Sequence, residues 1–577
     1  MKNESSRMKT ASKSGGKHLV VHALLMATLP LWEQLYDRAE FYPIGFGILL
    51  LGLCCVFRFM RRPLVSLTRT DGMFVLCLLY VVSRSVCQDD TALGTWFLFL
   101  YAGMVYVTAR MADRKGRKAL LYGLWAGGVL QGILVWLQYA DVCASSHRWF
   151  ECTGSFLNPA PLGGWLAMSM VVALHMLTHS RTSLSWKLTG WATVLLMGSA
   201  LVIADSRSSF LSFGIMSMML VMEKARIRCG WRWMVIVGAM LIAVLPLYMY
   251  RRSSADARVF IWKVCTEMVK DAPLFGHGTE GVKRNYMHYQ AEYLAEEGTA
   301  YECLQATDNS LAFNEGLQTA CEYGLVGLCL MALLLTMAWR ESTSGNPFRH
   351  LFVGMLVFSC FSYPLSVFSL LTLFFLTLGC LPAKPFKRMD VRKRMAIGFL
   401  AIPMLWGAGY VVFGNRATHA LDYFYWDEES EAEWNRYYPL LRNECEPVSR
   451  YAHSLVLNGE YASAIEPMEQ LIKLSPTVEI YCDLGYCYQS VGKVTDAESC
   501  YRYASSMAPG RIIPHYRLFC LYRLQKDWKR MCEEGEYILT MDVKIENEKV
   551  HKIRKEVKIY LEKKKIRIFV DNSHRRK

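Results

Sequence analysis

Apolar runs of about 16 to 22 residues alternate with short charged connectors through the first 414 positions of the chain. A helix needs about 20 apolar residues to cross the hydrocarbon core of a bilayer, so runs of this length predict membrane-spanning helices. The pattern predicts thirteen spans, or twelve if the first run, which His22 interrupts, does not cross. The predicted spans lie near residues 17–32, 43–57, 72–86, 92–109, 118–138, 160–178, 186–204, 207–223, 232–249, 317–338, 350–366, 368–382 and 394–414.

One long polar segment, residues 250–312, separates two of these runs. It carries Arg251, Arg252 and Arg258, followed by a Pro-Leu-Phe-Gly-His-Gly turn at 273–278. Loops held by a rigid scaffold often carry catalytic and binding residues. We therefore expect the chemistry of this protein to take place at this loop.

Lysine and arginine gather in alternate connectors, and this alternation predicts the topology. Loops rich in these residues stay on the cytoplasmic side of a membrane. The assignment places the loop 250–312, the turn at 205–207 and everything after residue 415 on the outer face, away from ATP. The basic connectors contain Lys2, Arg7, Lys9, Lys13, Lys17, Arg58, Arg61, Arg62, Arg69, Arg110, Arg114, Lys115, Arg117, Lys118, Lys224, Arg226, Arg228, Arg232, Lys384, Lys387, Arg388, Arg392, Lys393 and Arg394.

Composition agrees with a membrane protein that carries a soluble appendix. Hydrophobic residues make up 53% of the chain and charged residues 20%, compared with roughly 45–50% and 25% in soluble domains. The net charge of +15 comes mostly from the basic connectors and the tail after Lys544, so topology explains it better than nucleic-acid binding. The nineteen cysteines show no metal-ligand spacing. Cys143 and Cys152 could form a disulfide, although unpaired thiols are the favoured interpretation.

The pattern changes after Gly414. The composition of residues 415–445 predicts an acidic, solvated linker, and helical periodicity resumes at 446–545. A repeat is visible in residues 478–511, a second copy precedes it by 33 residues, and a degenerate third runs from about 513 to 541. The repeat resembles the 34-residue tetratricopeptide unit, which stacks as helical hairpins and presents a surface to protein partners. A basic helical tail is expected at 546–577. The residues that carry the repeat are Gly459, Ala464 and Pro476, then Leu484, Gly485, Tyr488, Gly492, Ala497, Tyr501, Ala504 and Pro509.

Arg207 lies in a short polar turn between two apolar runs, where a charge is costly unless it pairs, snorkels or serves a ligand. Arg258 opens a segment whose spacing predicts a short amphipathic helix on the membrane surface. Two guanidinium groups from separate loops would form a clamp for a diphosphate, because each offers a fork of donors and keeps its charge. Pairing of Arg207 with Asp205, and plain surface charge for Arg258, remain the alternatives.

Two further places invite a catalytic interpretation. His277, within the glycine-containing turn, could act as a base or phosphate donor, although a loop histidine is more often a bystander. Asn314 and Glu315 open the span near 317–338, where a carboxylate at the membrane edge suggests function and helix capping by Asn314 is the simpler alternative.

Taken together, residues 150–340 resemble the O-antigen ligase and polymerase superfamily, membrane enzymes that move a lipid-linked glycan onto an acceptor. The order of the motifs matches as well as their content. The matching positions are Gly154 to Pro159 with Asn158, then Ser206 and Arg207, Arg258 to Trp262, Asp271 with Pro273 to Gly278, and finally Asn314, Leu317, Glu322, Gly324 and Gly327.

This resemblance implies an undecaprenyl-diphosphate glycan donor, neither cofactor nor metal, and arginines that bind the diphosphate, here Arg207 and Arg258. We count Arg251, Arg252, Asn314 and Asn158 as candidate substrate-binding residues. The chain departs from the family at Phe313, which stands where the family has a catalytic histidine.

The general base is therefore open among His277, Asp308 and Glu315, with a carboxylate slightly favoured. A branch that needs little base assistance, or an inactive one, would also fit.

The sequence thus predicts an all-α chain, in which a multi-pass membrane bundle with a large outer loop precedes a soluble helical solenoid. The leading functional interpretation is a glycosyltransferase of the ligase type that attaches a preassembled glycan to an acceptor hydroxyl at the outer face of the bacterial inner membrane. Ligation to a lipid A core, polymerisation of repeat units and transfer to protein hydroxyls all remain open within the superfamily. A transporter of lipid-linked sugar and a scaffold for tetratricopeptide partners are alternatives outside it.

Overall fold

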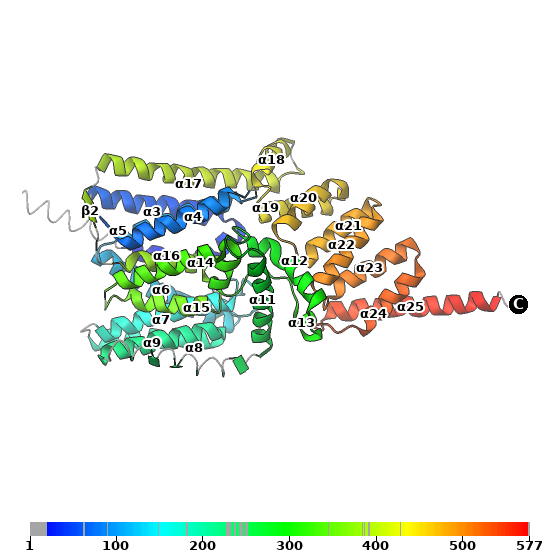
Figure 1. Cartoon of the computed structure of the whole chain (residues 1–577), viewed down its shortest axis with the longest axis horizontal. Coiled ribbons are helices and arrows are strands. Elements are labelled where there is room, and N and C mark those ends of the chain that lie inside the picture. Colours follow the sequence, from blue (N-terminus) through cyan, green and yellow to red (C-terminus); the bar gives the residue numbers. More distant parts are fainter. Residues whose placement is uncertain are drawn as a thin grey trace, which may run out of the picture.

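The computed structural model describes most of the chain from residue 20 to residue 574, and it shows a bundle of long helices joined to an array of shorter ones (Figure 1). The last helix extends away from this body toward the C-terminus. The described residues are 20–61, 64–88, 90–147, 149–179, 183–226, 231, 234, 235, 238, 239, 242, 246, 248, 249, 252–343, 345–382, 385, 387–390, 393–426 and 428–574.

Helices occupy most of each predicted span that the structure describes, except that the span predicted at 350–366 leaves the helix after Ser359. The run predicted at 17–32 is helical over 20–28 and continues through η1 (Leu29–Leu31) into α2 (Trp32–Arg38). The span predicted at 232–249 falls mostly outside the described residues. The bundle helices are α3 (Phe41–Arg61), α4 (Arg69–Val86), α5 (Leu93–Met111), α6 (Arg114–Tyr139), α7 (Pro159–His179), α8 (Leu184–Ala204), α9 (Arg207–Lys224), α14 (Glu315–Glu341), α15 (Phe348–Ser359), α16 (Phe368–Cys380) and α17 (Lys393–Asp422).

Within the described residues, six helices are long and apolar enough to cross a membrane, namely α3, α6, α7, α8, α14 and α17. This supports a multi-pass, all-α membrane protein. Helices α4 and α9 each include three charged residues near their ends, and α15 and α16 have only 12 and 13 residues. A helix rises about 1.5 Å per residue, so α15 and α16 are each shorter than the hydrocarbon core of about 30 Å.

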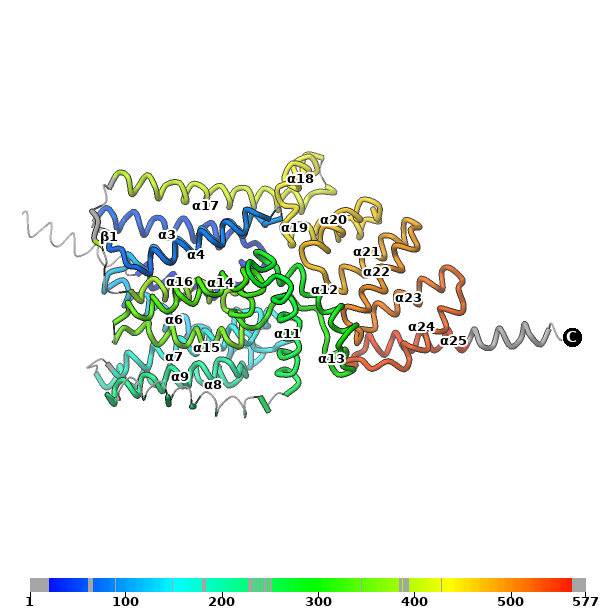
Figure 2. Tube along the Cα trace, viewed as in Figure 1, coloured from blue at the N-terminus to red at the C-terminus, as the bar shows by residue number. Residues whose placement is uncertain are grey.

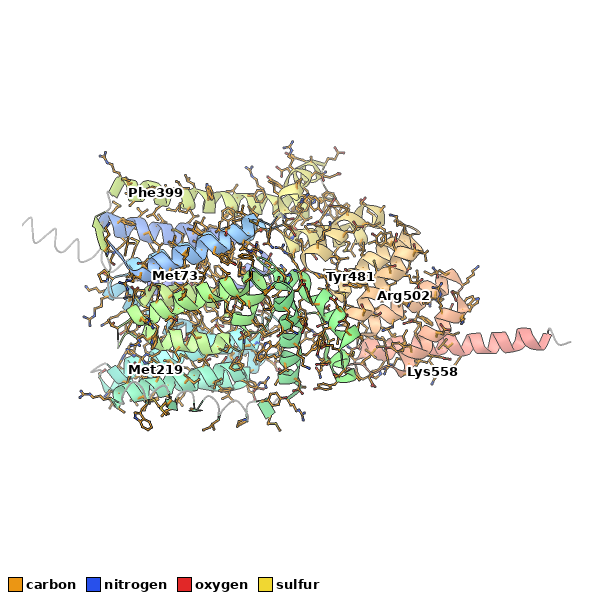
Figure 3. All side chains as sticks on the ribbon, viewed as in Figure 1. Met73, Met219, Phe399, Tyr481, Arg502 and Lys558 are labelled. Atoms are coloured by element: carbon orange, nitrogen blue, oxygen red, sulfur yellow. The ribbon has the colours of Figure 1, made fainter. Side chains whose placement is uncertain are left out.

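The outside of the bundle is apolar, as a lipid-facing surface must be. Phe399 on α17 is 70% exposed and lies at the outer edge of the bundle (Figure 3). Leu405 and Trp406 on the same helix are also largely exposed. Exposed apolar side chains on a long helix fit hydrocarbon better than water.

Three of the basic connectors meet at one end of the bundle. Strand β1 (Leu64–Leu67) lies in the connector after α3, and β2 (Lys387–Asp390) lies in the connector before α17. The two strands pair antiparallel and so join these connectors. Arg110 forms a 2.8 Å ion pair with Asp71 and donates to the carbonyl of Ser66 at 3.0 Å. The loop that follows residue 251 lies at the opposite end (Figure 2).

The long polar loop is itself folded into three helices, α11 (Arg252–Asp271), α12 (Gly281–Glu296) and α13 (Ala300–Gln305). Helix α11 runs across the end of the bundle (Figure 2). The sequence predicted a short helix on the membrane surface, but the buried stripe of α11 faces α12 and α14 instead. The members of that stripe are Phe260, Val264, Cys265 and Met268.

The segment predicted as an acidic linker, 415–445, is helical over most of its length. Helix α17 continues to Asp422, and α18 (Glu428–Leu441) packs back against it. Trp434 on α18 is fully buried among apolar residues of α17. The acidic residues gave the segment its polar character, but the other face of α18 is apolar.

The chain then forms three helical hairpins, which we call the hairpin array, residues 445–540. Equivalent first helices begin at Cys445, Val478 and Ile512, so the period is 33 and then 34 residues. Gly485 lies where a Cβ atom would approach the Tyr501 ring within 2.5 Å, which explains a small residue between paired helices. The tetratricopeptide assignment itself stays a prediction. The helices are α19 (Cys445–Leu457), α20 (Tyr461–Leu474), α21 (Val478–Ser490), α22 (Val494–Met507), α23 (Ile512–Gln525) and α24 (Trp528–Thr540), followed by α25 (Glu548–His574).

The hairpin array and the polar loop share one hydrophobic core. Gln290 on α12 donates to the carbonyl of Met507 at 2.7 Å, and His288 lies 2.6 Å from the Tyr503 hydroxyl. Both contacts join α12 to α22, and the array is thereby fixed to the loop that the sequence marks for chemistry.

A cavity of about 240 Å³ lies where the bundle, α12 and the start of α19 meet. Glu444 accepts a hydrogen bond from the Gly94 amide at 2.5 Å, and Glu40 accepts one from the Tyr410 hydroxyl at 3.2 Å. Burial, followed by the charges of Glu40 and Glu280, raises the pKa of Glu444 to about 8. Further titratable side chains around this cavity are Tyr36, Asp37, Arg38, Lys283, Cys445, Glu446 and Arg450.

We expect this junction to weaken as the pH rises. The pKa of Glu444 is raised in the folded protein, so the protonated carboxyl stabilises the junction. This contribution to stability is complete below about pH 4.3, the ordinary pKa of a glutamate, and is lost as the pH rises through about 8. Hydrogen exchange of α19 between pH 5 and pH 9 measures this loss. Glu444→Gln should reduce the pH dependence, with the remainder due to Glu40, whose pKa burial also raises, whereas Gln at the exposed Glu479 should leave it unchanged. An equal pH response in both variants would contradict the assignment.

Candidate functional site

Arg207 is the first residue of α9, directly after a two-residue turn that separates α9 from α8. Asp205 ends α8 in the left-handed conformation with φ of 47°, and this reverses the chain. The first turn of α9 contains no acidic residue. A cation at the positive end of a helix dipole is unfavourable by itself, so this position suits an anionic ligand that both the arginine and the helix can bind.

Arg258 lies on α11, one turn after Ser254. Its Nη1 donates to the carbonyl of Phe361 at 2.8 Å, and its guanidinium lies 5.6 Å from the centre of the Phe313 ring. Burial, together with the positive charge of Arg207, lowers the pKa of Arg258 to about 10. The guanidinium therefore remains charged at neutral pH, within a partly dry and already positive environment.

The structure brings the two arginines together. Arg207 Nη2 donates to the Ser254 hydroxyl at 3.1 Å, which places its guanidinium against the same helix that carries Arg258. The positive charge of Arg207 adds to the effect of burial in lowering the pKa of Arg258, as expected if the two guanidinium groups are close. Two guanidinium groups held close together repel each other until an anion neutralises them, so the geometry favours a ligand of high negative charge.

Phe313 lies with its ring against the guanidinium of Arg258. It adopts a positive φ of 52°, which bulky residues rarely do, and it is held there by neighbours on both sides. Its ring packs edge-on against Tyr363 with 5.2 Å between ring centres. The Phe313 ring therefore orients Arg258 through a cation–π contact. A phenylalanine side chain cannot accept a proton.

Residues 360–367 form a non-helical loop between α15 and α16, although the sequence predicted a helix to residue 366. Helix α15 ends at Ser359, and Pro364 starts a short 3-10 turn. Three candidate residues hold this loop. Arg258 binds the Phe361 carbonyl, Asn314 Nδ2 donates to Cys360 O at 3.1 Å, and Glu315 Oε1 accepts the Leu365 amide at 2.7 Å.

The loop 360–367 and its Tyr363 belong to the site, and the sequence interpretation missed them. Proline within an apolar run was the available signal, because proline lacks an amide hydrogen and seldom continues a helix. Ser254 was missed as well, and nothing local in the sequence distinguishes it from the adjacent Ser253.

Asn158 acts at the start of α7, where its side-chain oxygen accepts the Ala160 amide at 3.0 Å. The first turn of α7 lies beside that of α9, because the Ser209 hydroxyl is 3.5 Å from the Ala160 carbonyl. Asn314 caps α14 in the same way, accepting the Leu317 amide at 3.0 Å. The N-termini of α7, α9 and α14 thus lie around the arginines. Each N-terminus contributes a partial positive charge.

His277 lies away from the arginines. The turn 273–278 fills a break in α14 at Gly324, where φ is 65°, and a Cβ atom at that glycine would lie 2.2 Å from the Leu274 carbonyl. The amides of His277 and Gly278 donate to Cys321 O and Glu322 O at 2.8 and 2.7 Å. These contacts join the turn 273–278 to the break in α14.

The His277 ring also has a structural partner, since its Nε2 is 2.9 Å from the carbonyl of Met268. Met268 is ten residues after Arg258 on α11, about 15 Å along the helix axis. The structure therefore gives His277 a role in docking the turn, and it does not support this residue as the base.

The other candidates have different surroundings. Asp308 forms a 2.9 Å ion pair with Arg511 and accepts the Val478 amide at 2.8 Å, so its carboxylate is committed to the hairpin array. Arg252 is 71% exposed and lies 3.6 Å from Asp256. Arg251 lies outside the described residues.

Glu315 is the remaining candidate, and it binds the same loop 360–367 that Arg258 binds. It is 7% exposed, and within the described part of the chain its carboxyl has one hydrogen bond, from Leu365. No group of three or more His, Cys, Asp or Glu side chains among the described residues could hold a metal ion. Cys143 and Cys152 are free thiols.

Comparison with known families agrees with this location. Residues 192–332 match the family model described as O-antigen ligase. The matched segment runs from α8 to α14, and it contains both arginines, the folded loop and the break at Gly324. No curated protein matches the chain. The family match supports the O-antigen ligase superfamily and a glycosyltransferase of the ligase or polymerase type.

Proposed function

We propose that this chain is a glycosyltransferase of the O-antigen ligase type, which moves a preassembled glycan from undecaprenyl diphosphate to an acceptor hydroxyl. The observation that carries the proposal is the pair formed by Arg207 and Arg258, which come from separate elements and meet within the family-matched segment. The match alone supports a ligase or polymerase. The arginine pair adds a specific place for the diphosphate.

The proposed reaction breaks the bond between the anomeric carbon of the glycan and a diphosphate oxygen. The acceptor oxygen forms the new bond to that carbon and loses its proton, while the leaving diphosphate keeps the bonding electron pair. Its negative charge grows as the bond breaks, so fixed cations in a partly dry site bind the transition state more tightly than the donor. The three helix starts around the site act in the same direction.

We assign the proton acceptor to Glu315. It adjoins Asn314 and Phe313, and it shares the loop 360–367 with Arg258. Asp308 and His277 have structural partners of their own. The assignment needs no histidine at position 313.

The arrangement of the basic connectors supports an outward-facing site. Three of them lie together at the end of the bundle opposite α11. If they are cytoplasmic, as their charge predicts, the arginine pair and the hairpin array lie on the periplasmic side of the inner membrane. A lipid-linked donor then supplies the energy for transfer where ATP is absent.

The acceptor class decides between ligation, polymerisation and protein glycosylation. Purified full-length protein would be incubated with lipid-linked glycan and, in separate reactions, with lipid A core, with additional donor, or with a protein that carries Ser and Thr hydroxyls. We expect lipid A core to acquire glycan. Transfer to donor or protein alone would overturn the ligase assignment and keep the superfamily, whereas no transfer in any reaction would favour a transporter or scaffold.

A further inference from the structure

A cavity of about 250 Å³ lies beside Arg258, between α11 and the segment 305–313. Pockets for drug-sized ligands have about 300–1,000 Å³, so this one suits a single sugar ring. Ser254 lines the cavity and accepts a hydrogen bond from Arg207. Whatever fills the cavity is therefore contiguous with an anion bound by the two arginines. The lining residues are Ser254, Ala257, Arg258, Phe260, Ile261, Gln290, Gln305, Thr307, Asp308, Asn309 and Phe313.

The chemistry of the walls fits a neutral polyhydroxyl ligand. Gln305, Thr307 and Asn309 offer amide and hydroxyl groups, which both donate and accept hydrogen bonds as sugar hydroxyls do. Phe313 supplies an apolar ring for the carbon-bound hydrogens of a sugar face. The one lining carboxylate, Asp308, is already paired with Arg511, so the cavity does not select a cation.

The hairpin array holds the outer wall of this cavity in place. Asp308 receives the Arg511 guanidinium and the Val478 amide of the array, and Lys544 Nζ, just after the array, donates to the Gln305 carbonyl at 2.9 Å. Gln290 bridges the two parts, because its amide donates to Thr307 O at 3.2 Å and to Met507 O at 2.7 Å. Residues 306–309, after the end of α13, lie in no helix or strand, and these contacts set their position.

We propose that this cavity binds the saccharide unit next to the diphosphate. We further propose that the hairpin array fixes the shape of the cavity, through the ion pair of Arg511 with Asp308. The proposal rests on the proposed transferase function, because the arginine pair defines which part of the substrate reaches the cavity. The saccharide is either the first sugar of the donor or the accepting sugar. Arg511 is a positioning residue in this scheme, and the hairpin array shapes the site in addition to any partner that it recruits.

Two variants test the proposal in the purified full-length protein. Thr307→Val removes a lining hydroxyl at constant shape, and we expect it to raise KM by about three- to tenfold. Arg511→Ala releases Asp308, and we expect a rise of roughly fivefold in the same KM with a smaller change in kcat. Arg523→Ala is the matched control, because Arg523 lies on α23 and its guanidinium contacts α25, at Glu556 (3.5 Å) and at the Tyr560 ring.

The source of the sugar is decided by titrating donor at saturating acceptor, and acceptor at saturating donor. A rise confined to the donor KM places the first donor sugar in the cavity, and a rise confined to the acceptor KM places the accepting sugar there. Both results support the site. Unchanged KM values in both variants, in an enzyme that Arg258→Ala inactivates, would overturn it while leaving the transferase function intact.

A binding measurement separates the two proposals if no transfer is found. Calorimetry with glycan released from the lipid carrier should give weaker binding to Thr307→Val than to the wild-type chain, and equal binding to Arg523→Ala. Equal affinity in all three proteins would overturn the cavity assignment without reference to catalysis.

Discussion

Replacing either Arg207 or Arg258 with alanine is expected to reduce glycan transfer by about 10²–10³-fold, as the loss of one preorganised charge donor does in other enzymes. Each guanidinium stabilises negative charge that develops on the leaving diphosphate. The effect should appear mainly in kcat, because the charge grows between donor and transition state. Transfer of labelled glycan by purified variants measures it.

The control for this experiment is Lys270→Ala, which removes a positive charge from the same helix. Lys270 is 66% exposed and pairs with Glu267 at 2.8 Å, far along α11 from Arg258. Its loss should leave transfer unchanged. Membrane insertion and melting temperature of all three variants should match the wild type. Transfer at the wild-type rate by Arg207→Ala and Arg258→Ala would refute the diphosphate clamp and return the chain to the scaffold interpretation.

Glu315→Gln is expected to lower kcat by about 10²–10⁴-fold, which is the usual contribution of a positioned proton acceptor. Glutamine keeps the shape of the side chain, and its oxygen can still accept the Leu365 amide at the place where the Glu315 carboxylate does. The loop 360–367 should therefore stay in position, and the loss should be chemical. Glu315→Asp, which retains a carboxylate at a shorter reach, should keep part of the activity.

The matched control is Glu296→Gln, a glutamate that is exposed on α12 of the same loop. It should transfer glycan at the wild-type rate. If Glu315→Gln were as active as the wild type, the residue would have no role in proton transfer. If Glu315→Asp and Glu315→Gln lost activity and melting temperature together, Glu315 would serve only to hold the loop.

The sequence was a good guide wherever one local rule decides the outcome. Hydrophobic length located the bundle helices, because each apolar run must become a helix to satisfy its backbone in a membrane. The recurrence of small and aromatic residues located the hairpins with a period of 33 to 34 residues. Hydrophobic length failed at Pro364, where the apolar run 350–366 does not remain helical. The apolar residues on both sides of the proline concealed this break.

Residue roles were harder to predict, since they depend on the partner that the fold supplies. Asp308, His277 and Glu315 looked alike as loop candidates. The fold gives the first an arginine from the hairpin array, the second the carbonyl of Met268, and the third the loop that Arg258 also binds. No separation in sequence encodes those partners, which lie up to 203 residues away, as between Asp308 and Arg511.

The amino-acid sequence by itself determined the membrane bundle, the place of the long polar loop and the residues able to bind a diphosphate, because hydropathy, charge and side-chain chemistry are local properties. Only the tertiary structure decided that Arg207 and Arg258 are neighbours, that Phe313 and the loop 360–367 orient Arg258, and that the hairpin array holds the wall of the adjacent cavity. These arrangements follow from packing between elements distant in the chain, where burial and hydrogen bonding act on the whole fold.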